Sequence, residues 1–171
     1  MRTLCCVVLI AVACGTGAGT LRSGSAAAQS ETRELFAQVD TRVRIFMKTV
    51  AHDVTQEGPI AWKKFFADSP AFFMANDGQL AFPNSAAAAK GIEDFAKTIK
   101  NMELRWGSDL RVDPLAANLA SLGVSWREIR VDTAGKRVDE GGYFTGTAQL
   151  RNGRWQFRNA HWSTSNPPPA F

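Results

Sequence analysis

The sequence has few of the side chains that carry most protein chemistry. It contains 171 residues but only three cysteines, two histidines and one tyrosine. The three cysteines, Cys5, Cys6 and Cys14, all lie close to the amino terminus. The remaining chain therefore offers no disulfide, no cysteine nucleophile and no thiolate metal ligand. We expect core packing alone to hold this part together.

Charge and motifs give no sign of a nucleic acid or a nucleotide. The formal net charge is +4, and it falls to +2 without the first 28 residues, which hold two basic residues and no acidic one. Basic residues are dispersed, and those in Arg127-Glu128-Ile129-Arg130 alternate with an acid, which predicts a solvated strand face. P-loop and G-x-S-x-G patterns are missing from the sequence. We expect no nucleic-acid partner and no cofactor.

The amino-terminal apolar run is too short to span a bilayer. Residues 4–13 are apolar and follow Arg2, which is typical of an export signal. The small residues before Gln29 provide a cleavage site ending at Ala28. These features predict that residues 1–28 are an export signal and that the protein is periplasmic or secreted.

A lipid anchor is the alternative for the same segment. Ala11-Val12-Ala13-Cys14 resembles a bacterial lipobox, in which Cys14 would be the lipidated residue. Residues 15–30, rich in glycine, serine and alanine, would then form a flexible tether. This alternative predicts a protein held at the cell envelope, with membrane contact only through Cys14. The sequence leaves both possibilities open.

Helical periodicity dominates the next part of the chain. Apolar side chains recur at three- and four-residue spacing over residues 31–54, which predicts a long amphipathic helix. Pro59 suits the first turn of a short second helix over residues 60–67. Ser85 is the expected N-cap of a third helix.

Strand patterns follow the helices. A short hairpin is predicted around Asn76-Asp77-Gly78, and Gly141, Gly142 and Gly146 predict a strongly bent sheet. Helices followed by strands favour an α+β fold, a cone-shaped roll of a curved antiparallel sheet wrapped around the N-terminal helices. We expect this domain over residues 29–165 and a disordered tail over residues 166–171. The four long strands are expected at residues 102–112, 119–131, 138–150 and 155–162.

Three stretches of this region resemble the nuclear transport factor 2-like superfamily, which includes SnoaL-like and ketosteroid-isomerase-like proteins. The resemblance covers about residues 31–165 and implies a cone-shaped fold. It also implies that homodimers are common, and that isomerases, cyclases, dehydratases and plain binding modules are all compatible with the fold. The stretches are Trp62-Lys63-Lys64-Phe65-Phe66-Ala67-Asp68 with Ala71-Phe72-Phe73, Gly91-Ile92-Glu93-Asp94-Phe95, and Gly142-Tyr143-Phe144 through Asn152-Gly153-Arg154-Trp155 to His161-Trp162-Ser163.

The residues of ketosteroid isomerase chemistry do not match this sequence. The resemblance places the catalytic carboxylate of that family on the first strand, where Phe73, Met74 and Ala75 stand here. The first helix has no tyrosine, and the position of the family's second acid falls near Gly146. We therefore reject ketosteroid isomerase chemistry for this chain.

His161 and Tyr143 are the candidate catalytic residues. Counted by twos, His161 shares a strand face with Trp155, Phe157 and Asn159. If that face meets the core, the imidazole points into the cone and can act as a general base. Tyr143 can donate a hydrogen bond to a ligand. A structural histidine and an ordinary cross-strand tyrosine are the alternatives.

The pocket wall is expected to combine aromatic side chains with a few polar ones. The predicted ligand-binding residues are Trp62, Phe73, Trp106, Trp126, Tyr143, Asn159 and His161.

A metal site is not expected, because His52 and Asp53 are adjacent on a helix and their side chains diverge by about 100°.

The function expected from these patterns is binding of a small apolar molecule by an exported domain. The first alternative is an enzyme of the isomerase, cyclase or dehydratase type that uses His161 as its base. The second alternative is a homodimeric association domain, which would expose an apolar patch on the outer side of the sheet.

Overall fold

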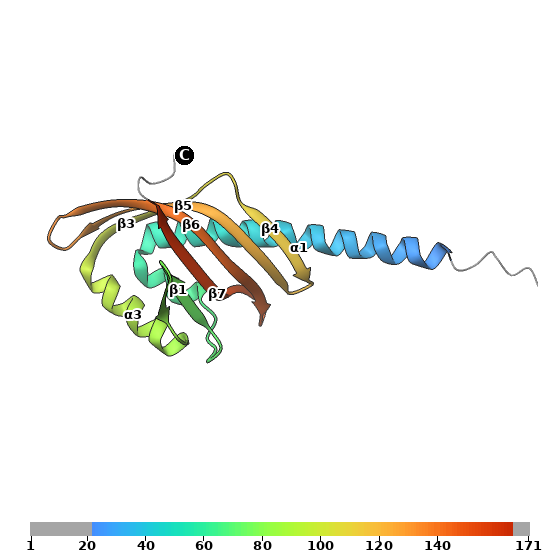
Figure 1. The fold of residues 1–171 in the computed structure, drawn as a ribbon, viewed down its shortest axis with the longest axis horizontal. Helices are drawn as coiled ribbons and strands as arrows, with labels where there is room; N and C mark the ends of the chain where they lie inside the picture. Colours follow the sequence, from blue (N-terminus) through green and yellow to red (C-terminus); the bar gives the residue numbers. More distant parts are fainter. Residues whose placement is uncertain (1–21, 166–171) are drawn as a thin grey trace, which may run out of the picture. The chain divides into compact units, whose positions relative to one another are not determined.

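The computed structural model describes residues 22–165 (Figure 1). It divides into residues 22–33, which are helical, and residues 34–165, which hold the remaining elements. The predicted apolar run at residues 4–13, the lipidation position Cys14 and the tail at residues 166–171 lie outside the described residues.

The helical elements are one long helix, a short helical turn and two further helices. The chain breaks after α1 at Gly58, whose φ of 76° favours glycine. Pro59 then opens the next turn, as predicted from the sequence. The bounds are α1 Arg22–Glu57, the 3₁₀ turn η1 Pro59–Ala61, α2 Trp62–Phe65 and α3 Ser85–Thr98.

The start of α3 differs from the prediction by one residue. Asn84, not Ser85, is the N-cap, and its side-chain Oδ1 accepts a hydrogen bond of 2.9 Å from the backbone N–H of Ala87. An Asn side chain satisfies an unpaired amide at the start of a helix as well as Ser does.

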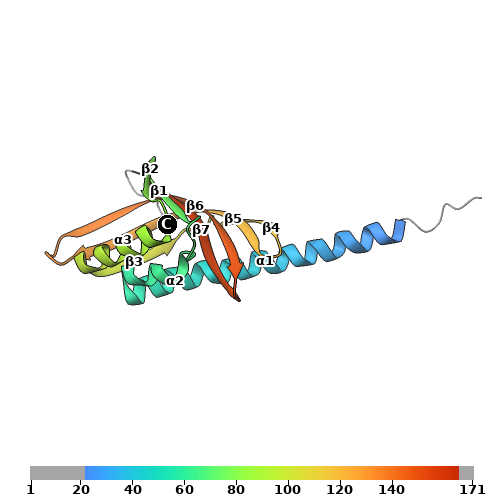
Figure 2. The same cartoon turned by 90° about the horizontal axis from the view of Figure 1, so that it is seen from below.

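Seven strands form one curved sheet whose order is β2-β1-β7-β6-β5-β3, with β4 also paired to β5. The sheet is mixed, because β1 runs parallel to β7 while the other pairs are antiparallel. The predicted antiparallel pairing therefore holds for every pair except β1 with β7. Figure 2 shows the long strands β5 and β6 curving over α2 and α3. The bounds are β1 Phe73–Asn76, β2 Gln79–Phe82, β3 Ile99–Trp106, β4 Arg111–Ala116, β5 Leu119–Asp132, β6 Arg137–Arg151 and β7 Arg154–Ser165.

The strand predicted over residues 102–112 is two strands. β3 pairs with the second half of β5, from Trp126 to Asp132, whereas β4 pairs with the first half, from Leu119 to Gly123. The chain turns away between them, where Asp109 accepts a hydrogen bond of 3.0 Å from the backbone N–H of Ser125. A continuous apolar pattern did not reveal this break.

Two predicted turns are confirmed. Asn152 and Gly153 join β6 to β7 with φ values of 50° and 76°. Asp77 and Gly78 join β1 to β2 with φ values of 47° and 80°. Positive φ at both central positions is the backbone geometry that Asn-Gly and Asp-Gly pairs favour in hairpins.

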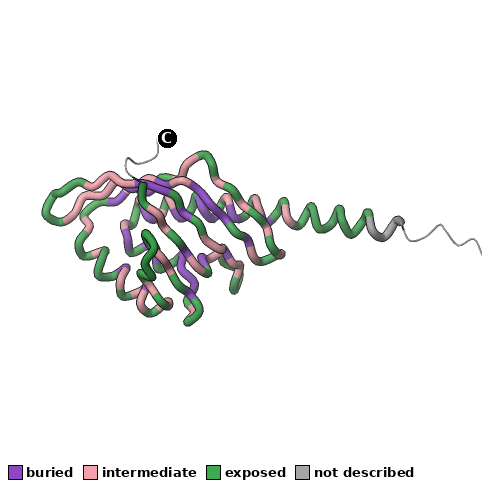
Figure 3. Tube along the Cα trace, viewed as in Figure 1, coloured by how far each residue is buried: buried purple, intermediate pink, exposed green. Residues whose placement is uncertain are grey.

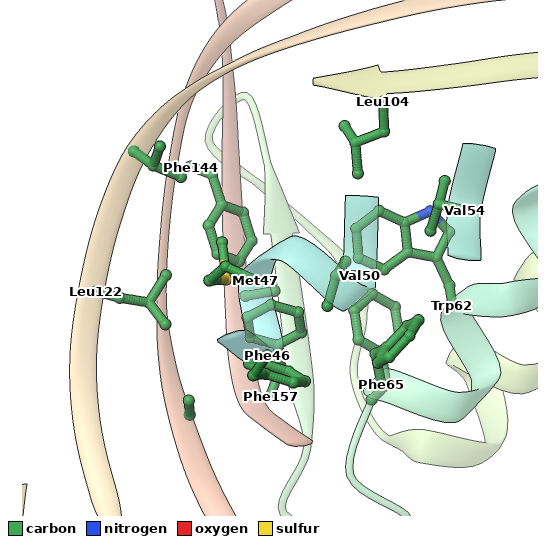
Figure 4. Packing of buried hydrophobic residues seen from close by; sticks show 14 of the residues in the cluster. Phe46, Met47, Val50, Val54, Trp62, Phe65, Leu104, Leu122, Phe144 and Phe157 are labelled. Carbon is green, nitrogen blue, oxygen red and sulfur yellow. The ribbon is translucent and has the colours of Figure 1, made fainter. Parts of the chain in front are cut away.

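The core lies between the inner face of the sheet and the helices, from residue 39 onward (Figure 3). From α1, Phe46, Met47 and Val50 meet Phe144 of β6 and Phe157 of β7 (Figure 4). The rings of Phe46 and Phe157 lie 4.8 Å apart. This α+β arrangement, with a curved sheet packed on helices, is the one that the sequence predicts.

Candidate functional site

A cavity of about 300 Å³ opens on the inner face of the sheet. β1, β2, β3, β5, β6 and β7 all contribute to it, together with α2 and α3. Its walls are mostly aromatic or aliphatic, which is typical of sites that bind small molecules. The main apolar wall residues are Trp62, Phe66, Phe82, Ile92, Trp126 and Trp162.

Three tryptophans set the shape of one wall. Trp62 and Trp126 both meet Trp162 edge to face, with ring centroids 5.5 and 5.1 Å apart and interplanar angles of 87° and 86°. Trp62 and Trp126 are 6 % and 4 % exposed. Edge-to-face packing fixes ring orientation, so this wall is held in place before any ligand arrives.

A charged corner interrupts the apolar wall. Glu128 and Arg130 of β5 and Glu140 of β6 line the cavity, and they are its charged lining residues. Nη1 of Arg130 donates a hydrogen bond of 2.5 Å to Glu128 and a second one to Glu140. Arg130 also lies over the ring of Phe95, with its Cζ 5.8 Å from the centroid. One guanidinium thus links two carboxylates at the edge of an aromatic cavity.

Glu128 is the buried charged residue among those described, with an exposed fraction of 8 %. Burial raises the pKa of its carboxyl above the ordinary value of 4.5, because the ionised form loses hydration. The hydrogen bond and charge of Arg130 oppose this shift, and the charge of Glu140 adds to it. The net direction is upward, so Glu128 holds a proton more readily than an exposed glutamate does.

Burial alone would lower the pKa of Arg130, but hydrogen bonds to Glu140 and Glu128 outweigh that effect. The net shift is upward, so the guanidinium stays charged. Arg130 is therefore a permanent cation between two carboxylates.

Trp126 contributes a second unusual polar group. Its indole N–H is buried and has no hydrogen-bond partner among the described residues. An unpaired buried donor costs about 1–3 kcal/mol, so such groups need a reason. Trp126 lines the cavity through its ring, while its N–H is shielded, as is the equally unpaired N–H of Trp155.

Gly91 of α3 has a clear packing role at the same cavity. A Cβ at this position would lie 2.3 Å from Cε1 of Phe82. The absence of a side chain therefore lets the Phe82 ring lie against the helix and form part of the wall.

The expectation that His161 points into the cone is wrong. Phe157 pairs with Ala148 and Asn159 pairs with Thr147, so Arg158 is an extra residue in β7. This bulge shifts the alternation, and His161 falls on the outer, exposed face of the sheet.

Tyr143 lies on the same outer face and is 38 % exposed. It neighbours Phe144, whose buried ring points inward, and strand alternation turns the two side chains to opposite faces. His161 and Tyr143 therefore do not converge on the cavity, and the catalytic proposal based on them is not carried further.

The other predicted ligand-binding residues divide into two groups. Trp62 and Trp126 line the cavity. Trp106 stands behind the wall, where its Nε1 donates a hydrogen bond of 2.8 Å to the carbonyl of Met47. Phe73 is 44 % exposed at the start of β1, and Asn159 accepts a hydrogen bond of 3.0 Å from the backbone N–H of Thr147 at the bulge.

Glu128 and Arg130 of the charged corner were missed because residues 127–130 were interpreted as a solvated strand face. Period-two alternation provides the missing signal, since Glu128 and Arg130 continue the inward face of Val124 and Trp126. The prediction placed these residues in solvent because charged side chains generally prefer water, although the alternation indicated an inward face. The finding of a buried Glu128 corrects it.

The described residues hold neither a cluster of metal ligands nor a membrane-spanning helix. Over residues 22–165, no three His, Cys, Asp or Glu side chains group together as metal ligands would. No helix within the same range is long and apolar enough to cross a membrane.

Comparison with solved structures shows which known fold this chain shares. Neither the protein-family models nor the curated proteins contain a match to this sequence. Solved structures do match. One is a nuclear transport factor 2-like superfamily protein from Salmonella enterica serovar Typhimurium, with a TM-score of 0.63, 16 % identity, and coverage of 79 % of this chain and 94 % of that one.

Two further similar structures are described as enzymes. A candidate scytalone dehydratase from Novosphingobium aromaticivorans has a TM-score of 0.63 and 16 % identity, and the match covers 75 % of this chain and 86 % of that one. A hexachlorocyclohexane dehydrochlorinase has a TM-score of 0.56 and 11 % identity, and the match covers 72 % of this chain and 84 % of that one. At such identities the likeness concerns the fold. The chain has the nuclear transport factor 2-like fold, as its sequence motifs had suggested.

Proposed function

We propose that this protein binds a compact, largely apolar small molecule in the cavity on the inner face of its sheet. The observation that carries the proposal is the cavity itself, about 300 Å³ in volume, with rigid aromatic walls and one charged corner. Apolar walls provide affinity, and a few fixed polar groups provide orientation.

A titration with a neutral apolar compound tests the proposal. tert-Butylbenzene should bind to the purified protein and change the fluorescence of the wall tryptophans. Met74→Trp should lower its affinity by about tenfold or more, because the larger side chain fills space at a half-buried lining position.

Leu80→Trp is the matched control for this titration. Leu80 is 62 % exposed on β2 and does not line the cavity, so its substitution should leave affinity unchanged. Binding that survives Met74→Trp, or that is lost equally in Leu80→Trp, would argue against this cavity as the site.

Proton transfer by Glu128 is a second candidate function. The specific observation is a buried carboxyl of raised pKa at the wall of a cavity, the environment in which catalytic acids and bases are often found. In heavy water, such a base would exchange the hydrogens next to the carbonyl of cyclopentanone. If the Glu128→Gln variant exchanges these hydrogens for deuterium as fast as the unaltered protein does, proton transfer by Glu128 is contradicted.

Export, lipidation at Cys14 and homodimerisation stay predictions. Mass spectrometry of the protein from its native host tests the first two, since an intact Met1 would contradict both. Light scattering tests the third, for which Tyr143 and Phe73 supply exposed aromatic surface. A monomer at high concentration would count against a homodimer.

A further inference from the structure

Two carboxylates face each other on the inner side of the sheet. Glu128 of β5 and Glu140 of β6 are directly paired in the antiparallel register. Like charges at such positions repel and destabilise the strand pair, the more so where burial removes water. A strand pair optimised for stability alone would not place them there, which indicates a functional reason.

The charges in this corner do not balance. Arg130 is the cation among the charged lining residues, and its Nη1 already bonds to both carboxylates. With all three groups ionised, the corner carries one excess negative charge. The remaining lining residues from α2, α3, β1, β2, β3 and β7 are uncharged, so nothing else lining the cavity compensates for it.

The walls beside this corner suit a positive charge. Indole and phenyl faces attract cations within about 6 Å. One such contact already exists here, because the guanidinium of Arg130 lies 5.8 Å from the ring of Phe95. Trp62 and Trp126, each nearly at a right angle to Trp162, offer with it further aromatic surface in the same cavity.

We propose that the cavity takes a compact organic cation, a protonated or quaternary amine on a small apolar body, with the Glu128–Glu140 pair as its counter-charge. This inference rests on the proposed small-molecule binding and specifies its ligand class. An anionic ligand is disfavoured, since Arg130 is already shared by two carboxylates and the corner is negative.

Proton binding and cation binding should compete at this corner. The raised pKa of Glu128 means that its carboxyl binds a proton more readily than an exposed glutamate does, even with Arg130 beside it. Arg130 and Glu140 are the charged groups that face it. Cation affinity should therefore increase as the pH rises from about 4.5 through the folded-state pKa of Glu128, and level off above it.

The sharpest test compares two compounds of the same shape. Phenyltrimethylammonium and tert-butylbenzene differ in a nitrogen cation that replaces a quaternary carbon. The protein should bind phenyltrimethylammonium about tenfold more tightly at pH 8. Glu140→Gln should reduce this preference to less than about threefold, because it removes half of the counter-charge.

Glu103→Gln is the matched control, since Glu103 is a half-buried residue of β3 that pairs with Arg105 and does not line the cavity. It should keep the tenfold preference. Glu128→Gln should also reduce the preference and remove its dependence on pH. Circular dichroism of each variant shows whether the fold is retained.

The outcomes separate the two proposals. If tert-butylbenzene binds as tightly as phenyltrimethylammonium, small-molecule binding stands and the cation inference is overturned. If the preference persists in both Glu128→Gln and Glu140→Gln, the carboxylate pair is not the counter-charge and the inference is again overturned. If neither compound binds at millimolar concentration, both proposals are overturned.

Discussion

The carboxyl group of Glu128 lies among aromatic rings, next to the guanidinium of Arg130 and the carboxyl of Glu140. Its burial affects the stability of the fold as well as the cavity. In the unfolded chain the group titrates near its ordinary value of 4.5, and in the folded protein it titrates higher. The folded state therefore binds this proton more tightly than the unfolded state does.

The sign of the pH effect follows from that difference. The contribution of Glu128 to stability is fully present below pH 4.5 and is lost as the pH rises through its folded-state pKa. Relative to Glu128→Gln, the free energy of unfolding of the unaltered protein should fall over this range. Urea unfolding of both proteins at several pH values measures it. A difference that stays constant, or grows with pH, would contradict a raised pKa.

Residue orientation shows where sequence reasoning was limited. Trp126 was expected at the pocket wall, and the structure places it there. His161 was expected on the same inner side, but one extra residue at Arg158 reverses the alternation after Phe157. A bulge leaves no pattern in a single sequence when the flanking residues fit either face. The alternation of side chains along β5 indicated that Glu128 points inward, although a charged side chain is usually expected in solvent.

At the scale of elements, the close approach of β6 to β7 explains one of the glycines that predicted a bent sheet. A Cβ at Gly142 would lie 1.8 Å from the backbone oxygen of Ser163. Gly142→Ala should therefore separate the two strands and lower the free energy of unfolding by about 2 kcal/mol or more. Thermal or urea denaturation measures the loss.

Gly123→Ala on the neighbouring strand is the control for this effect. The new Cβ would meet the ring edge of Tyr143 at 3.1 Å, and Tyr143 is exposed enough to move aside. Its cost should stay below about 1 kcal/mol. Equal losses in the two variants would show that backbone crowding at Ser163 is not the cause.

The start of α3 gives a second prediction at this scale. Asn84→Ala removes the side-chain oxygen that accepts from the N–H of Ala87, and should cost about 1 kcal/mol of folding stability. Ser85→Ala, one residue later, should cost less than about 0.5 kcal/mol, because the Ser85 hydroxyl makes only an exposed contact of 3.3 Å to Asp68. The reverse order of costs would restore Ser85 as the N-cap.

Elements were predicted from the sequence where local chemistry decides them. The Asn152-Gly153 and Asp77-Gly78 turns are confirmed because positive φ restricts the choice of residue. The parallel pairing of β1 with β7 was not predicted, because it joins segments far apart in the chain. The break between β3 and β4 escaped notice for the same reason, since only the pairing with β5 defines it.

For the whole molecule, helices early in the chain and strands late in it sufficed to predict an α+β fold with a curved sheet. That order, together with the motif resemblance, agrees with the solved structures that share this fold. The position of the cavity did not follow from the sequence, because it depends on which side chains converge after the sheet bends. Aromatic residues from three strands, β2, β5 and β7, and from two helices, α2 and α3, meet there.

The central claim is that a small molecule binds at the wall formed by Trp62, Trp126 and Trp162. The five tryptophans of the chain each give one indole N–H signal in a ¹H–¹⁵N spectrum. Trp155 is the internal control, because it does not line this cavity. During titration with phenyltrimethylammonium at pH 8, the account predicts shifts at the three wall tryptophans and none at Trp155. Shifts confined to Trp155, or no shift at Trp126, would contradict it.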